Sequence, residues 1–222
     1  MIYNCNSTSD QRPGMLAWVK AQNFESVIDI GPAWNPWTKD VITACIDMEN
    51  ISLPGVLTFK GNINDPDGWM EVENYIAEHG KFKFSICTHV LEDVCNPAYV
   101  VKQLQKVSEQ GFIAMPSKHW ELGFHVECWQ DSQTREWGLT SPWRGFFHHR
   151  WIFDMKGGTL WAFPKLGFVE KLDCFGWVKG REAWHEMTFW WKDDIPYKVI
   201  NDDYLGPNGP AVCQYYREHL TE

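Results

Sequence analysis

The stretch that decides the fold is VIDIGPAWNP at residues 27–36, where a short apolar run ends at an acid and a glycine and the chain then breaks at prolines. Four more apolar runs follow, at residues 41–47, 56–59, 82–87 and 112–115. Between them, residues 65–80 and 96–111 space apolar residues three or four apart, with Pro near the start and Gly at the end, a pattern typical of helices. Strands that alternate with helices predict an α/β protein with a doubly wound, mainly parallel sheet.

The second half of the chain has a weaker pattern and is rich in tryptophan. Ten of the 14 Trp residues lie after residue 115, and residues 117–147 show no regular spacing of apolar residues. We expect strands at residues 159–163, 168–172 and 186–191, with consecutive neighbours antiparallel, and a helix at 211–220. The patterns predict one domain with four parts: an N-terminal arm and helix (1–24, irregular through residue 13), a strand–helix half (25–116), an inserted Trp-rich cap (117–158), and C-terminal strands with a tail (159–222).

The composition argues against several classes of protein. The net charge is −9, with 20 Lys plus Arg against 29 Asp plus Glu, so duplex nucleic acid is not an expected partner, since its phosphates need a positive surface. No apolar run approaches the roughly 20 residues that cross a bilayer, and the opening MIYNCNSTSD does not resemble a signal peptide. The seven Cys residues include no C-x-x-C pair, which favours free thiols in a reducing cytoplasm. The oligomeric state stays open, with a homodimer as one alternative.

Polar residues stand where the first two predicted strands end. Asp29 and Gly31 close the first strand, and Asp47 closes the second, 16 residues after Gly31. Ligands of parallel sheets bind at the carboxyl ends of the strands, where an acid can accept both hydroxyls of a ribose. The first turn has one glycine instead of three, and Pro32 and Pro36 remove amides that a pyrophosphate would need. A nucleoside without phosphates therefore fits this turn better than a dinucleotide.

Several motifs resemble those of the class I S-adenosylmethionine-dependent methyltransferases, in particular the type 11-like branch. VIDIG at residues 27–31 resembles the first motif of the family, GNI at 61–63 the segment after the third strand, and SICTHVLEDV at 85–94 the run after the fourth. NP at 35–36, VLED at 90–93 and HHRW at 148–151 are similar to a bacterial and viral branch. The resemblance covers roughly residues 25–118. It implies a Rossmann-like sheet with an antiparallel C-terminal portion, and an enzyme that uses S-adenosylmethionine.

The resemblance also implies roles for individual residues. Methyl transfer is an in-line displacement at an activated carbon, so the protein mainly has to place the nucleophile, and a base is needed only if that nucleophile must lose a proton. Imidazole titrates in the right range for this, and the candidates are His89, His148 and His149. Eight residues would contact the cofactor: Asp29, Gly31 and Asn35 at the methionine part, Asp47 at the ribose, Asn62 and Ile63 at the adenine, and Thr88 and His89 at the sulfonium.

The acceptor is expected to contact the Trp-rich cap. Arg150 can pair with a carboxylate or phosphate, Trp151 can stack on a flat ligand, and His119 adds a polar contact. Together with the acidic composition, these residues favour a small molecule or a sugar as the acceptor. Glu92 and Asp93 are expected to be solvated acids at a helix start.

A cluster of His, Glu and Cys residues between positions 119 and 149 could be interpreted as a metal site. Its spacing, H-x5-H-x-E-C, matches no closed metal site, so we expect no bound metal. Two alternatives to methyl transfer stay open: a catalytically degenerate methyltransferase fold that only binds its ligands, and a hydrolase that uses this cluster. The cluster consists of His119, His125, Glu127, Cys128, His148 and His149.

Overall fold

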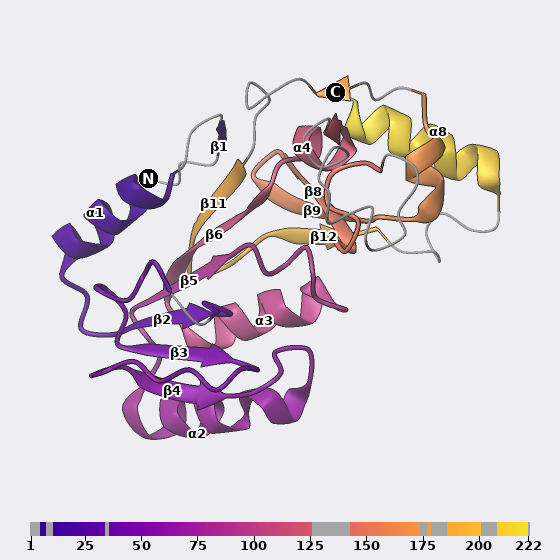
Figure 1. The fold of residues 1–222 in the computed structure, drawn as a ribbon. Coiled ribbons are helices and arrows are strands. Elements are labelled where there is room, and N and C mark those ends of the chain that lie inside the picture. The colour runs from indigo at the N-terminus through magenta and orange to yellow at the C-terminus, as the bar shows by residue number, and fades with distance from the viewer. Residues whose placement is uncertain are drawn as a thin grey trace, which may run out of the picture.

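A computed structural model of the chain describes residues 5–7, 11–33, 36–125, 143–173, 177–178, 186–200 and 208–221. Its centre is a seven-stranded sheet in the order β1-β11-β6-β5-β2-β3-β4 (Figure 1). The five strands from β2 to β6 are parallel, and β11 and β1 complete the sheet antiparallel to their neighbours. Counted from β2, the parallel strands lie in the order 3-2-1-4-5 of a doubly wound nucleotide-binding fold. The strands are β1 (Cys5–Ser7), β2 (Val27–Ile30), β3 (Ala44–Asp47), β4 (Leu57–Lys60), β5 (Phe84–Thr88), β6 (Gln110–Pro116) and β11 (Glu186–Lys192).

Helices cover both faces of this sheet, as the fully buried strands β2 and β3 require. Side chains alternate along β2: Ile28 and Ile30 pack into the core formed with α2 (Met70–His79) and α3 (Pro97–Val107). Val27 packs into the opposite core, where α1 (Arg12–Gln22) contributes Met15 and Val19. The short 3-10 helix η1 (Pro66–Trp69) leads into α2. Both faces of the sheet therefore carry apolar cores, so the ends of the strands are the part of the sheet where a ligand can bind.

Local sequence signals set the helix ends. The Asn96 side chain accepts a hydrogen bond of 3.1 Å from the Tyr99 amide, and Pro97 follows at the first turn of α3, where the missing amide costs nothing. Gly80 ends α2 with a φ of 82°, a left-handed backbone angle that glycine adopts without strain. These ends bring the chain back to the sheet for β5 and β6.

A smaller layer lies beside β6 and α3 (Figure 1). It contains a three-stranded sheet in the order β12-β9-β8, a two-stranded sheet of β10 and β7, and α8, which packs on the three-stranded sheet through Tyr216 and Leu220. Strands β8 and β9 form an antiparallel hairpin. The elements are α4 (Lys118–Leu122), β7 (Phe124–His125), β8 (Trp151–Lys156), β9 (Thr159–Pro164), the 3-10 helix η2 (Gly167–Lys171), β10 (Trp177–Val178), β12 (Tyr197–Val199) and α8 (Gly209–Leu220).

The predicted fold class is confirmed: the sheet is doubly wound and mostly parallel, with antiparallel strands in the C-terminal portion. Three details of the prediction were wrong. The arm is not irregular through residue 13, because Cys5–Ser7 pairs with β11 and α1 already begins at Arg12. The expected strand at 168–172 is the 3-10 helix η2. The boundary at residue 158 falls in the turn between β8 and β9, which belong to one sheet. Among the described residues, no helix is long and apolar enough to span a membrane.

Candidate functional site

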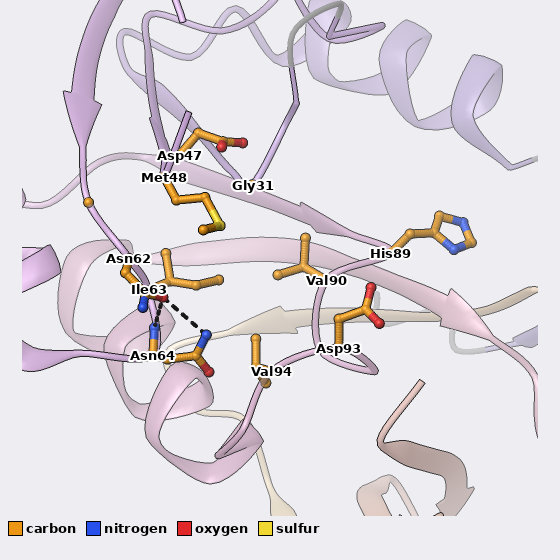
Figure 2. A pocket seen from close by; sticks show the side chains of 11 residues that line it. Gly31, Asp47, Met48, Asn62, Ile63, Asn64, His89, Val90, Asp93 and Val94 are labelled. Atoms are coloured by element: carbon orange, nitrogen blue, oxygen red, sulfur yellow. Dashed lines mark hydrogen bonds between the residues drawn. The ribbon is translucent and has the colours of Figure 1, made fainter. Parts of the chain in front are cut away.

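A pocket of about 250 Å³ opens at the carboxyl ends of β2, β3, β4 and β5, just below the usual size range for small-molecule sites. Residues 62–64 lie at one end of the pocket, and His89 and Asp93 lie at the other (Figure 2). The pocket occupies the position where parallel α/β sheets bind ligands. Its lining consists of Gly31, Asp47, Met48, Gly61, Asn62, Ile63, Asn64, His89, Val90, Asp93 and Val94.

Gly31 forms the turn after β2 and has to be glycine for two reasons. Its φ of 69° lies in the left-handed region that glycine adopts freely. A Cβ at this position would come within 2.8 Å of Cγ2 of Val90. The single glycine of the first motif therefore lets the β2 turn approach the β5 turn closely, with the pocket beside both.

Asp47 ends β3 and holds the turn that follows β2. Its Oδ2 accepts a hydrogen bond of 3.0 Å from the Ala33 amide, and its Oδ1 accepts one of 2.8 Å from the Glu49 amide. A carboxylate has about four acceptor positions, so each oxygen retains one for a ligand. Asp47 lines the pocket and can therefore accept from two neighbouring hydroxyls.

The loop after β4 forms the opposite wall. The Asn62 side-chain oxygen accepts from the Asn64 amide at 3.1 Å, while its Nδ2 donates to Asp65 at 2.8 Å. The indole of Trp69, which is completely buried, donates to the Ile63 carbonyl at 3.0 Å. These bonds fix the loop so that it presents the side chain of Ile63 and the amide of Asn62 to the pocket (Figure 2).

Asp29 does not line the pocket. Its side chain is buried under the turn and accepts a hydrogen bond from the Thr38 hydroxyl. The pKa of Asp29 is raised from 3.8 to about 7, mainly by burial; the bonds from Thr38 and the Ile30 backbone lower it and the charge of Asp47 adds a smaller rise. Near pH 7 this carboxyl is therefore partly protonated, which suits a buried structural group.

His89 follows β5 with a left-handed φ of 54° and stands between two carboxylates. Its Nε2 lies 3.1 Å from Oε1 of Glu186, and its Nδ1 lies 3.4 Å from Oε1 of Glu92. Burial opposes the charged imidazolium, but the hydrogen bond to Glu186, the close contact with Glu92 and the negative charges of both carboxylates outweigh it and raise the pKa of His89 to about 9. At neutral pH the ring is a cation, so in this state it acts as a proton donor.

The prediction that Glu92 is a solvated acid was wrong, because its side chain is buried. Only 1% of it is exposed, and neither carboxylate oxygen has a hydrogen-bond partner among the described residues. The ion pair with His89 compensates part of the cost of burying its charge. Asp93 is exposed as expected, yet it lines the pocket.

The HHRW segment, residues 148–151, packs against the turn that carries Glu92. The backbone amides of Arg150 and Trp151 both donate to the Glu92 carbonyl, at 2.7 and 3.2 Å. The Trp151 indole donates to the Val94 carbonyl at 2.8 Å. The Arg150 side chain is exposed, and Trp151 is half-buried. Two motifs 55 residues apart in the sequence, counted from residue 93 to residue 148, thus lie side by side at the pocket rim.

The two histidines of this segment have different surroundings. His148 is exposed, with its Nε2 3.9 Å from Oδ1 of Asp93. His149 is buried, and its Nδ1 lies 2.7 Å from Oε1 of Glu121. His119 lies in α4, where partial burial followed by the charge of Lys118 lowers its pKa.

Five of the eight predicted cofactor residues line the pocket: Gly31, Asp47, Asn62, Ile63 and His89. Asp29 lies beneath it, Thr88 is the last residue of β5, and Asn35 lies outside the described residues. The side chain of His125 also lies outside them, as do Glu127 and Cys128. The sequence analysis missed Glu186, 97 residues from His89, and no local motif marks it.

No protein-family model matches the chain, and no curated protein matches it. Among solved structures it is similar to the N-terminal domain of EvdMO1 with SAH bound, at 14% identity and a TM-score of 0.39, over 52% of this chain and 53% of that one. It is also similar to the methyltransferase domain of bacterial CtHen1-C, at 11% identity and a TM-score of 0.45, over 83% and 97% of the two chains. A SAM-dependent methyltransferase from Thermotoga maritima matches at 10% identity and a TM-score of 0.40, over 81% and 87%.

The chain thus spans about half the length of the first of these structures. Likeness of this degree assigns neither an activity nor a substrate to the chain.

Proposed function

We propose that the protein is an S-adenosylmethionine-dependent methyltransferase that acts on a small-molecule or sugar acceptor. The observation that carries the proposal is the strand-end pocket, in which Asp47 keeps two acceptor positions beside a close glycine turn. An acid at this strand end suits the two hydroxyls of a ribose. The described lining of the pocket has two separate glycines, Gly31 and Gly61, and no row of glycine amides, so a nucleoside fits it better than a nucleotide.

Within this proposal the cofactor extends from the 62–64 loop to His89. Asn62 offers a neutral amide and Ile63 an apolar surface for the adenine, and Asp47 accepts from the ribose. The sulfonium end lies near His89. The two negative charges of Glu92 and Glu186 outweigh the single positive charge of the His89 ring. The three groups together carry one net negative charge, which favours a bound cation.

The chemical step transfers a methyl group from sulfur to the acceptor. The carbon–sulfur bond breaks as the bond from the nucleophile to carbon forms, and S-adenosylhomocysteine leaves as a neutral thioether. The protein contributes mainly alignment. His89, protonated at neutral pH, would donate a hydrogen bond that orients the acceptor. Two further roles stay predictions: proton removal by His148 or His149, and contacts with the acceptor by His119, Arg150 and Trp151.

A cytoplasmic location is part of the proposal. The described cysteines Cys45, Cys87, Cys95 and Cys213 are all free thiols, which fits a reducing compartment.

Calorimetric titration with S-adenosylmethionine and S-adenosylhomocysteine tests the cofactor assignment. We expect both to bind, and we expect Asp47→Ala to weaken both by at least tenfold. Asp40→Ala is the matched control, because Asp40 is an exposed acid outside the pocket and its loss should leave binding unchanged. Folded protein that binds neither compound would refute the proposal.

The single glycine of the β2 turn keeps the degenerate binding protein as a second candidate. Incubation with labelled S-adenosylmethionine and a metabolite pool separates the two functions. Transfer of label to any acceptor supports the enzyme, whereas tight cofactor binding without transfer supports the binding protein.

A further inference from the structure

Three side chains that could hold a metal ion meet at the rim of the pocket. Asp93 follows β5, while His148 and His149 precede β8, and their ligand atoms all lie within 4.8 Å of one another. Two imidazoles and one carboxylate form a common ligand set for divalent transition metals. The H-x5-H-x-E-C spacing that matches no closed metal site runs from His119 to Cys128 and contains none of these three residues.

The backbone holds these side chains together. The amides of Arg150 and Trp151 donate to the Glu92 carbonyl, and the Trp151 indole donates to the Val94 carbonyl. Three hydrogen bonds therefore keep His148 and His149, just before Arg150, adjacent to Asp93, just after Glu92. The meeting of His148, His149 and Asp93 follows from this strand connection.

His149 carries an independent sign of a metal ligand. Its Nδ1 must donate to the Glu121 carboxylate, 2.7 Å away, because an ionised carboxylate only accepts. In neutral His149 the lone pair then lies on Nε2. A ligating histidine usually donates its other ring N–H to a carboxylate or carbonyl in this way, which fixes the tautomer and makes the ligand more basic.

Glu121 is itself held in place. Its Oε2 lies 2.8 Å from Nζ of Lys165, which also donates to the carbonyls of Arg144 and Phe146 at 2.7 Å. Both Glu121 and the side chain of Lys165 are buried. His149 is consequently presented by a rigid, charge-compensated support, while His148 and Asp93 are exposed and can rotate.

We propose that Asp93, His148 and His149 bind one divalent first-row transition-metal ion, such as zinc, at the rim of the pocket. Ligand atoms about 2.1 Å from such an ion lie about 3.4 Å apart in tetrahedral geometry. Rotation of the exposed Asp93 and His148 side chains toward the fixed His149 closes the remaining gap. Three protein ligands leave an open position, and Asp93 places it beside the pocket.

Calorimetric titration of the chelator-treated full chain with Zn²⁺ tests the site. We expect one equivalent to bind, and we expect His148→Ala and Asp93→Asn each to weaken binding at least tenfold. Glu121→Gln, which keeps the size of the side chain but not its charge, should weaken binding by about 10–100-fold through His149. His79→Ala and Cys95→Ser are the controls, since these exposed groups offer imidazole and thiol ligands elsewhere, and both should bind like the wild type.

Absence of Zn²⁺ binding would overturn the proposal, as would equal affinity in His148→Ala or loss of binding in Cys95→Ser. If Glu121→Gln fails to fold, the two exposed variants still decide the question, because neither side chain supports the core. The site does not depend on methyl transfer. A chain that binds Zn²⁺ but no S-adenosylmethionine would refute the proposed function and leave the metal site standing, and the reverse result would refute only the metal site.

Discussion

Asp29→Asn should stabilise the protein relative to the wild type, by an amount that grows as pH rises from about 4 to about 7. Asp29 is 2% exposed, and the Thr38 hydroxyl is the side chain that donates to it among the described residues. Burial is the largest cause of the rise in its pKa from 3.8 to about 7. The unfolded chain ionises near the lower value, and the folded protein ionises near the higher one.

The size of the effect follows from this difference in pKa. Between pH 4 and 7 the folded state holds a proton that the unfolded state has lost, so folding takes up that proton and the free energy of unfolding falls as pH rises. Each pH unit in this window is worth about 1.4 kcal/mol, which gives a total of about 4 kcal/mol. Above pH 7 both states are ionised and the penalty is constant; below pH 4 both are protonated and it vanishes.

Urea unfolding of wild type and Asp29→Asn from pH 4 to pH 8.5 measures this penalty. The difference in free energy of unfolding should rise in favour of the variant by about 4 kcal/mol up to pH 7 and then level off. Any cost of placing an amide beside Thr38 is independent of pH and shifts the whole curve. Glu78→Gln, which removes an exposed acid, should show no such rise. A difference that stays flat with pH, or that falls, would refute the reasoning.

Three further predictions test the site and its supports. In guanidinium unfolding, Gly31→Ala should lower the free energy of unfolding by at least roughly 1–2 kcal/mol, because the left-handed backbone at this position disfavours a Cβ and that atom would contact Val90. Adding Val90→Ala to the same chain should recover part of the loss. Trp69→Ala should cost about 3–5 kcal/mol in the same assay, since the ring is fully buried, and a loss below about 1 kcal/mol would contradict that. An NMR titration of His89 should give a midpoint near 9, and Glu186→Gln should lower that midpoint. The stabilisation of the folded state by this ion pair is complete below pH 6.5 and is lost as pH rises through 9. A wild-type midpoint near 6.5 would refute the pairing.

The sequence predicted the features that depend on neighbouring residues. Alternating strands and helices from β2 to β6 could be read from apolar spacing and from Pro and Gly at the helix ends, and the strand ends then located Gly31, Asp47 and His89. Position alone could not show which way a side chain faces. Asp29 has the same strand-end signal as Asp47, but it precedes the end by one residue and turns into the core on the α1 side.

Contacts between distant segments set the properties that the sequence left open. His89 owes its raised pKa to Glu186 on an antiparallel strand, and the burial of Glu92 follows from the docking of residues 150–151 on its carbonyl. The same docking brings His148 to Asp93, so one connection between the Trp-rich region and the parallel sheet both buries Glu92 beside His89 and assembles the three side chains proposed as metal ligands. Apolar periodicity carries no information about such a connection, because two of its three hydrogen bonds use backbone amides, which every residue except proline supplies.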